Sequence, residues 1–87
     1  MTPEEERDRI VFALDNAIEE AQTFGQGDHD DFRELVKRAR EMHDILLQAL
    51  RQHPRLDTAG MAAYVQSTRN HIQELELLAG ASSLSRH

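Results

Sequence analysis

The chain contains no cysteine and no tryptophan, and its 87 residues include only two prolines and four glycines. Without cysteine, no disulfide framework can form, and neither a thiolate metal site nor a thiol nucleophile is available. A chain of this length forms one small domain, and such domains bury only about 60–65% of their unfolded surface. The core must therefore come from apolar packing alone, to which a second copy or a bound partner would add.

Long hydrophobic runs are also missing. No stretch approaches the run of about 18 apolar residues that a transmembrane helix needs. The first residues, Met-Thr-Pro-Glu-Glu-Glu, are the opposite of the basic and apolar start of a signal peptide. We therefore expect a cytoplasmic protein that has no membrane partner.

Basic residues are outnumbered by acidic ones, 10 to 16, and the formal net charge is −6. Phosphate contacts need a positive surface, so we expect no nucleic-acid partner. Residues 1–31 carry a charge of −8 and the rest of the chain carries +2. Within the second part, Arg33, Lys37 and Arg40 share one helix face at i, i+4 and i+7. This basic face either pairs with the acidic first segment or steers a partner electrostatically.

Recognisable catalytic and metal-binding motifs are absent. The five histidines include no His-x-x-x-His pair, and none has an acidic residue three positions before it. Gly25-Gln26-Gly27 lacks the Lys-Ser/Thr ending of a phosphate-binding loop, and no serine lies in a Gly-x-Ser-x-Gly elbow. We therefore expect no catalytic residues, no metal, no cofactor and no small-molecule substrate, so the protein is predicted not to be an enzyme.

What the chain does have is helical periodicity, in three segments of about 3–24, 29–53 and 58–79. In the first segment, Thr2 is a suitable N-cap, Pro3 fits the first helical position, and Glu5 completes a capping box. Gly25 is the predicted C-terminal stop. The apolar stripe steps by 4 and 3 through Ile10, Leu14, Ala17, Ala21 and Phe24.

The second segment has the strongest stripe, which is thick enough for a central helix covered on two sides. Its apolar positions are Phe32, Leu35, Ala39, Met42, Leu46 and Ala49, widened by Val36, Ile45, Leu47 and Leu50. Pro54 is expected to stop this helix, because the residue before a proline is disfavoured in the α region.

The third segment begins after a turn in which Asp57 is the predicted N-cap, with Leu56 and Met61 forming a hydrophobic staple. Its stripe runs through Met61, Val65, Thr68, Ile72, Leu75 and Ala79. Gly80 is predicted to end the helix, and residues 81–87 are predicted to be a disordered tail.

Three helices of similar length with short connections predict a single all-α domain over residues 1–80. We expect an antiparallel three-helix bundle, up-down-up, that is able to dimerise. The alternative is a long two-helix hairpin with a loosely packed first helix, completed by dimerisation.

Several apolar side chains fall outside the three stripes, and we expect some of them to mark a partner groove or a dimer seam. The sequence thus predicts a non-enzymatic interaction module, a small bacterial or phage adaptor or chaperone-like protein that binds itself or a protein partner through an apolar helix face. The alternative function is a small acidic inhibitor that blocks a partner's functional surface, including by nucleic-acid mimicry. The predicted partner-binding residues are Phe12, Leu47, Tyr64 and Leu77, with Arg33, Lys37 and Arg40 as charged flanks.

Overall fold

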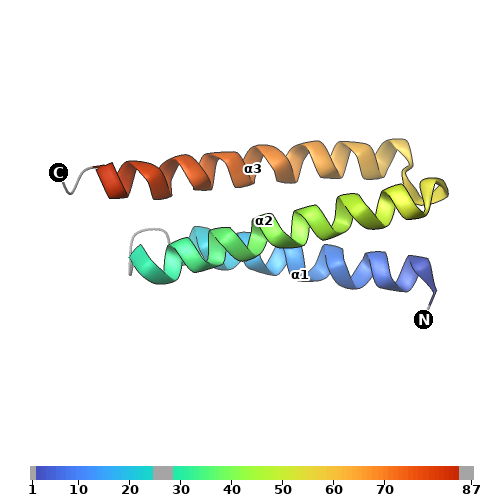
Figure 1. The fold of residues 1–87 in the computed structure, drawn as a ribbon, viewed down its shortest axis with the longest axis horizontal. Helices are drawn as coiled ribbons and strands as arrows, with labels where there is room; N and C mark the ends of the chain where they lie inside the picture. Colours follow the sequence, from blue (N-terminus) through green and yellow to red (C-terminus); the bar gives the residue numbers. More distant parts are fainter. Residues whose placement is uncertain (1, 25–28, 85–87) are drawn as a thin grey trace.

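The computed structural model describes residues 2–24 and 29–84, and places the side chains of residues 2–23 and 30–80. The chain forms three α-helices, α1 (Pro3–Phe24), α2 (His29–Gln52) and α3 (Ala59–Leu84), and a 3₁₀ helix, η1 (Pro54–Leu56). No strand occurs in either described range. The all-helical fold class is confirmed, and the three long helices lie side by side as a helical bundle (Figure 1).

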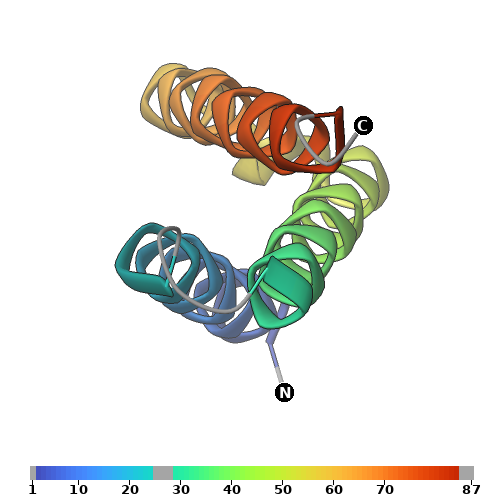
Figure 2. The same ribbon diagram turned by 90° about the vertical axis from the view of Figure 1, so that its left-hand side faces the viewer.

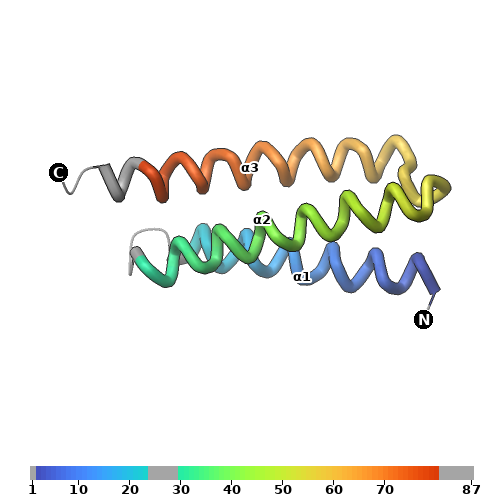
Figure 3. The backbone as a smooth tube through the Cα atoms, in the orientation of Figure 1, coloured from blue at the N-terminus to red at the C-terminus, as the bar shows by residue number. Residues whose placement is uncertain are grey.

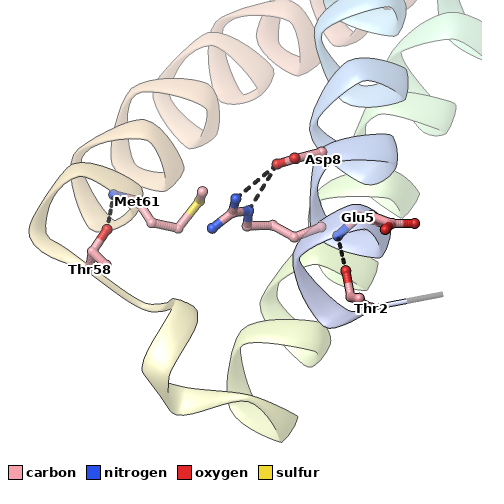
Figure 4. Close-up of polar contacts among 6 residues, drawn as sticks. Thr2, Glu5, Asp8, Thr58 and Met61 are labelled. Carbon is pink, nitrogen blue, oxygen red and sulfur yellow. Dashed lines mark hydrogen bonds and ion pairs between the residues drawn. The ribbon is translucent and has the colours of Figure 1, made fainter.

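The start of α1 follows the predicted cap. The hydroxyl of Thr2 accepts a hydrogen bond from the backbone N–H of Glu5 at 3.1 Å (Figure 4). The carbonyl of Thr2 accepts a second one from the N–H of Glu6 at 3.0 Å. Glu4, Glu5 and Glu6 occupy the first turn, where the positive end of the helix dipole favours negative charge. The predicted stop at Gly25 lies outside the described residues.

Pro54 ends α2, as the sequence predicts. The residue before it, His53, has φ −129° and ψ 75°, outside the α region. The chain then makes one 3₁₀ turn, in which the N–H of Leu56 bonds to the carbonyl of His53 at 2.9 Å and that of Asp57 to Pro54 at 3.0 Å. The turn buries Leu56 in the core and joins α2 to α3 at the end of the molecule where α1 begins (Figure 3).

The N-cap of α3 is Thr58, so the prediction of Asp57 was wrong by one residue. The hydroxyl of Thr58 accepts a hydrogen bond from the N–H of Met61 at 3.2 Å (Figure 4), and its carbonyl accepts one from Ala62 at 2.8 Å. The backbone of Asp57 still belongs to the 3₁₀ turn, and the helix therefore begins later. With Thr58 as the cap, Leu56 and Met61 no longer hold the positions of a hydrophobic staple.

The C-terminal part of α3 also differs from the prediction, because the helix continues through Gly80 to Leu84. No glycine in the described ranges has a positive φ, so Gly80 does not adopt the left-handed conformation of a helix stop. A glycine inside an exposed helix lowers helix stability by about 1 kcal/mol relative to alanine. The residues next to Gly80, Ala79 and Ala81, have the highest helix propensity and offset this loss. Residues 81–84 of the predicted tail are thus helical, and residues 85–87 lie outside the described residues.

The core is built around α2. Its largest fully buried side chains are Leu14 from α1, Phe32 and Leu46 from α2, and Ile72 from α3. The other buried apolar residues are Ile10, Ala17, Ile18, Ala21, Val36, Ala39, Leu50, Leu56 and Leu75. Among the side chains that the structure places, no buried nitrogen or oxygen lacks a hydrogen-bond partner. The predicted role of α2 as a helix covered on two sides agrees with this packing.

The three helices do not pack equally. Contact is most extensive between α1 and α2, less so between α2 and α3, and smallest between α1 and α3. Viewed along the bundle, α1 and α3 both lie alongside α2 (Figure 2). The molecule measures 47 × 21 × 17 Å, with a radius of gyration of 14.2 Å, whereas a compact domain of this length has about 12 Å.

The alternative of a loosely packed first helix is therefore wrong, because the less attached helix is α3. The reason lies in the stripes. The stripe of α1 buries five apolar residues, whereas α3, among the side chains that the structure places, buries Ile72, Leu75 and the polar Thr68. Met61, Tyr64 and Val65 of α3 reach the core only in part.

Candidate functional site

The predicted apolar anchors lie on three helices and do not form one site. Phe12 is 69% exposed and Leu77 is 73% exposed, whereas Leu47 and Tyr64 are half-buried. Leu47 lines one hollow of the surface and Tyr64 another, and neither Phe12 nor Leu77 lines either of the two. The exposure of Phe12 and Leu77 shows that the fold leaves large apolar groups outside its core.

Tyr64 links the two helices that contact each other least. Its hydroxyl donates a hydrogen bond to Oδ1 of Asp15 at 2.6 Å and lies 3.4 Å from the carbonyl oxygen of Val11, both on α1. Burial, the hydrogen bond to Asp15 and the negative charge of Asp15 raise the pKa of Tyr64. Tyr64 is therefore a structural tie between α3 and α1, in addition to its predicted role as a partner-binding residue.

Beyond this tie, a groove separates α1 from α3. It consists of two adjoining hollows of about 460 and 320 Å³ that share Gln22 of α1 and His71 of α3. We call it the α1–α3 groove. Its lining residues are Asp15, Ile18, Glu19, Ala21 and Gln22 from α1, Phe32 from α2, and Tyr64, Ser67, Thr68, His71, Glu74, Leu75 and Leu78 from α3.

The groove has an apolar base and a polar rim. Ile18 and Phe32 belong to the buried core, and Leu75 is 5% exposed. Leu78, by contrast, is 58% exposed although it lines the groove. Because burying a leucine side chain contributes about 1.5–3 kcal/mol, this residue is the strongest apolar anchor that the groove offers to another molecule.

The charges of the groove are of one sign. Asp15, Glu19 and Glu74 line it, and no lysine or arginine does so among the side chains that the structure places. Apart from these three carboxylates, the ionisable side chains in the described lining are His71 and Tyr64. A charged partner would therefore meet negative potential along this surface.

The predicted basic face of α2 lies elsewhere. Arg40 contacts Glu76 of α3 at 3.4 Å and Asp44 of its own helix at 3.9 Å. Lys37 is exposed and Arg33 is half-buried. Arg40 thus forms an ion pair with α3. One of the two predicted roles of this face was to pair with the acidic first segment instead.

A further hollow of about 410 Å³ lies near the turn between α2 and α3. Leu47, Leu50, Pro54, Ala62 and Val65 supply its apolar lining, and Arg51 and Asp57 complete it. It carries charges of both signs, so it has less electrostatic preference than the α1–α3 groove. The predicted residue Leu47 belongs to this hollow.

Leu78 lines the groove but is not among the partner-binding residues predicted from the sequence. It directly follows the predicted residue Leu77 in the chain. Both are exposed, but only Leu78 lines the groove. No local signal distinguishes the two, since the difference depends on how α3 is rotated against α1.

Within the described ranges, no group of three or more histidine, aspartate or glutamate side chains is placed to hold a metal ion. None of the helices in these ranges has both the length and the apolar character needed to cross a bilayer. Comparison of the chain with models of protein families, with curated proteins and with solved structures found no match.

Proposed function

We propose that this chain is a non-enzymatic protein–protein interaction module, an adaptor or chaperone-like protein that binds a partner or a second copy of itself through an apolar helix surface. The observation that carries the proposal is the α1–α3 groove, in which Leu78 stays 58% exposed over a buried apolar base. A contiguous apolar surface that remains open beside a core is typical of a protein–protein interaction site, which supports this proposal.

The arrangement of the helices supports this proposal. We take the module as an antiparallel, up-down-up bundle, in keeping with α1 beginning at one end of the molecule and α3 ending at the other (Figure 1). Both α1 and α3 pack on α2 more than on each other. A helix of another molecule laid between them would complete a four-helix arrangement, a common way for helices to bury apolar faces.

Site-specific photocrosslinking tests the proposal. A photoreactive phenylalanine analogue is placed in turn at Phe12, Leu47, Leu77 and Leu78, and at exposed Glu41 of α2 as a control, and adducts formed in cell extract are identified by mass spectrometry. We expect a protein adduct from at least one apolar position and none from Glu41. If none of the four apolar positions gives an adduct, with self or with another protein, the module hypothesis fails.

A second candidate function, the acidic inhibitor, is favoured by the surface of α1. This helix exposes Glu5, Glu6, Asp8, Asp15, Glu19 and Glu20. If the crosslinked partner is a nucleic-acid-binding protein, and Glu6→Lys with Glu20→Lys, both outside the α1–α3 groove, together abolish capture, the inhibitor replaces the adaptor. Capture of a nucleic-acid-binding protein that survives this double reversal argues against mimicry.

A further inference from the structure

We propose that the occupant of the α1–α3 groove is a basic amphipathic helix of another protein. This inference rests on the proposed interaction function and adds the chemistry of the partner. It depends on three properties of the groove: its length, its apolar base and the sign of its charges.

The length of the groove suits a helix. Along α3 it extends from Tyr64 to Leu78, a distance of about 21 Å at 1.5 Å per residue. A docked helix of about four turns would span this distance. The hydrogen bond between Tyr64 and Asp15 crosses from α3 to α1 and marks one end, whereas Leu78 lies toward the other.

The apolar base suits one face of such a helix. Leu75 and Leu78 are three residues apart on α3, and Ile18 faces the same groove from α1. Side chains spaced by three and four residues on a partner helix would contact this surface, the usual pattern of a helix bound in a groove. Polar residues of the partner would then lie along the rims.

The charges on the rims select a basic partner. Asp15 and Glu19 lie on one side and Glu74 on the other, without a lysine or arginine in the described lining. A cationic partner would therefore be attracted along the described part of the groove.

The same charges disfavour a second copy of this chain. Its helix α1 has seven acidic and two basic residues, α2 has five of each, and α3 has two acidic and one basic. None of them carries a net positive charge. The helix without net charge, α2, is already covered on two sides by α1 and α3. Like charges placed across an interface are destabilising, so a different protein is the better occupant.

Peptide binding followed by fluorescence anisotropy tests the inference. Three labelled peptides of equal length are compared: an amphipathic helix with a leucine face and lysine flanks, the same peptide with glutamate in place of every lysine, and a scrambled version of the first without an apolar face. We expect the lysine peptide to bind at least about tenfold more tightly than the other two, and its affinity to fall as salt is raised.

Two pairs of neighbouring residues supply matched variants. Leu78→Asp should weaken binding of the lysine peptide by about tenfold or more, whereas Leu77→Asp, on the adjacent exposed position outside the groove, should change it less than about twofold. Glu19→Lys should weaken binding by about threefold and Glu20→Lys, with the same change in net charge, by less. Circular dichroism confirms that each variant keeps its helices.

Three results would overturn the inference. One is equal affinity for the lysine and glutamate peptides, or binding of neither. Another is loss of binding that is as large in Leu77→Asp as in Leu78→Asp. The third is a dimer in sedimentation equilibrium that Leu78→Asp dissociates, since the occupant is then a second copy. None of these results contradicts the proposed interaction function if photocrosslinking gives adducts. Failure of the basic-helix inference can therefore be distinguished from failure of the proposed function.

Discussion

Replacing Tyr64 by phenylalanine tests whether a single hydrogen bond holds α3 to α1. The substitution removes only the hydroxyl that donates to Asp15 at 2.6 Å. A hydrogen bond to a charged group contributes about 1.5–3 kcal/mol, but Asp15 is exposed and Tyr64 half-buried, so solvent screening reduces the value. We expect the free energy of unfolding to fall by about 1 kcal/mol, which lowers the Tm of a domain of this size by about 4–8 °C.

A double-mutant cycle isolates this interaction from other effects of the substitution. Unfolding by urea is measured for the native chain, Tyr64→Phe, Asp15→Ala and the double variant. If the two residues interact as the structure indicates, the two single losses add up to more than the loss in the double variant, by about 0.5–1 kcal/mol. A coupling energy near zero would refute the view that this bond ties the helices.

The pH dependence of stability gives an independent check of the same contact. The pKa of Tyr64 is raised in the folded protein, because burial and then Asp15 disfavour the tyrosinate. The stabilisation is therefore complete below the unfolded pKa of about 10 and is lost as the pH rises above it. Tyr64 is the only tyrosine, so the ultraviolet absorbance of tyrosinate reports its titration directly. Stability that falls equally steeply in Tyr64→Phe over this range would contradict the assignment.

The remaining predictions concern the stability of the fold, measured by urea denaturation followed by circular dichroism. Thr58→Ala should cost about 1 kcal/mol because Thr58 is the N-cap of α3, and Asp57→Ala less than about 0.5 kcal/mol; the reverse order would contradict the cap. Gly80→Ala should add about 0.5–1 kcal/mol, since a Cβ at this helical position meets nothing within 4 Å. A loss of stability would show that the helix does not pass through Gly80. Leu46→Ala, at a fully buried position, should cost about 2.7–5 kcal/mol, against less than about 0.5 kcal/mol for the exposed Leu77→Ala.

The site was only partly predictable. Exposure of Phe12 and Leu77 follows from their distance from the apolar stripes, and the structure agrees. Tyr64 was expected to face a partner, but its hydroxyl bonds to Asp15, 49 residues away in the chain. Such a contact has no local signature in the sequence, because it depends on the relative position of α1 and α3 along the bundle axis. The groove itself, with Leu78 in it, has the same origin.

What the sequence alone determined is what depends on neighbouring residues. The 3.6-residue periodicity defined three helices, Thr2 capped the first, and Pro54 ended the second, since each acts within a few positions of the chain. The cap at Thr58 and the passage of α3 through Gly80 are also local features, but the sequence patterns misplaced the cap and ended the helix too early. Tertiary structure alone decided the unequal packing of the helices and the α1–α3 groove. Both depend on the orientation of α3 relative to α1 and α2, which determines that Leu78 and not Leu77 lines the groove.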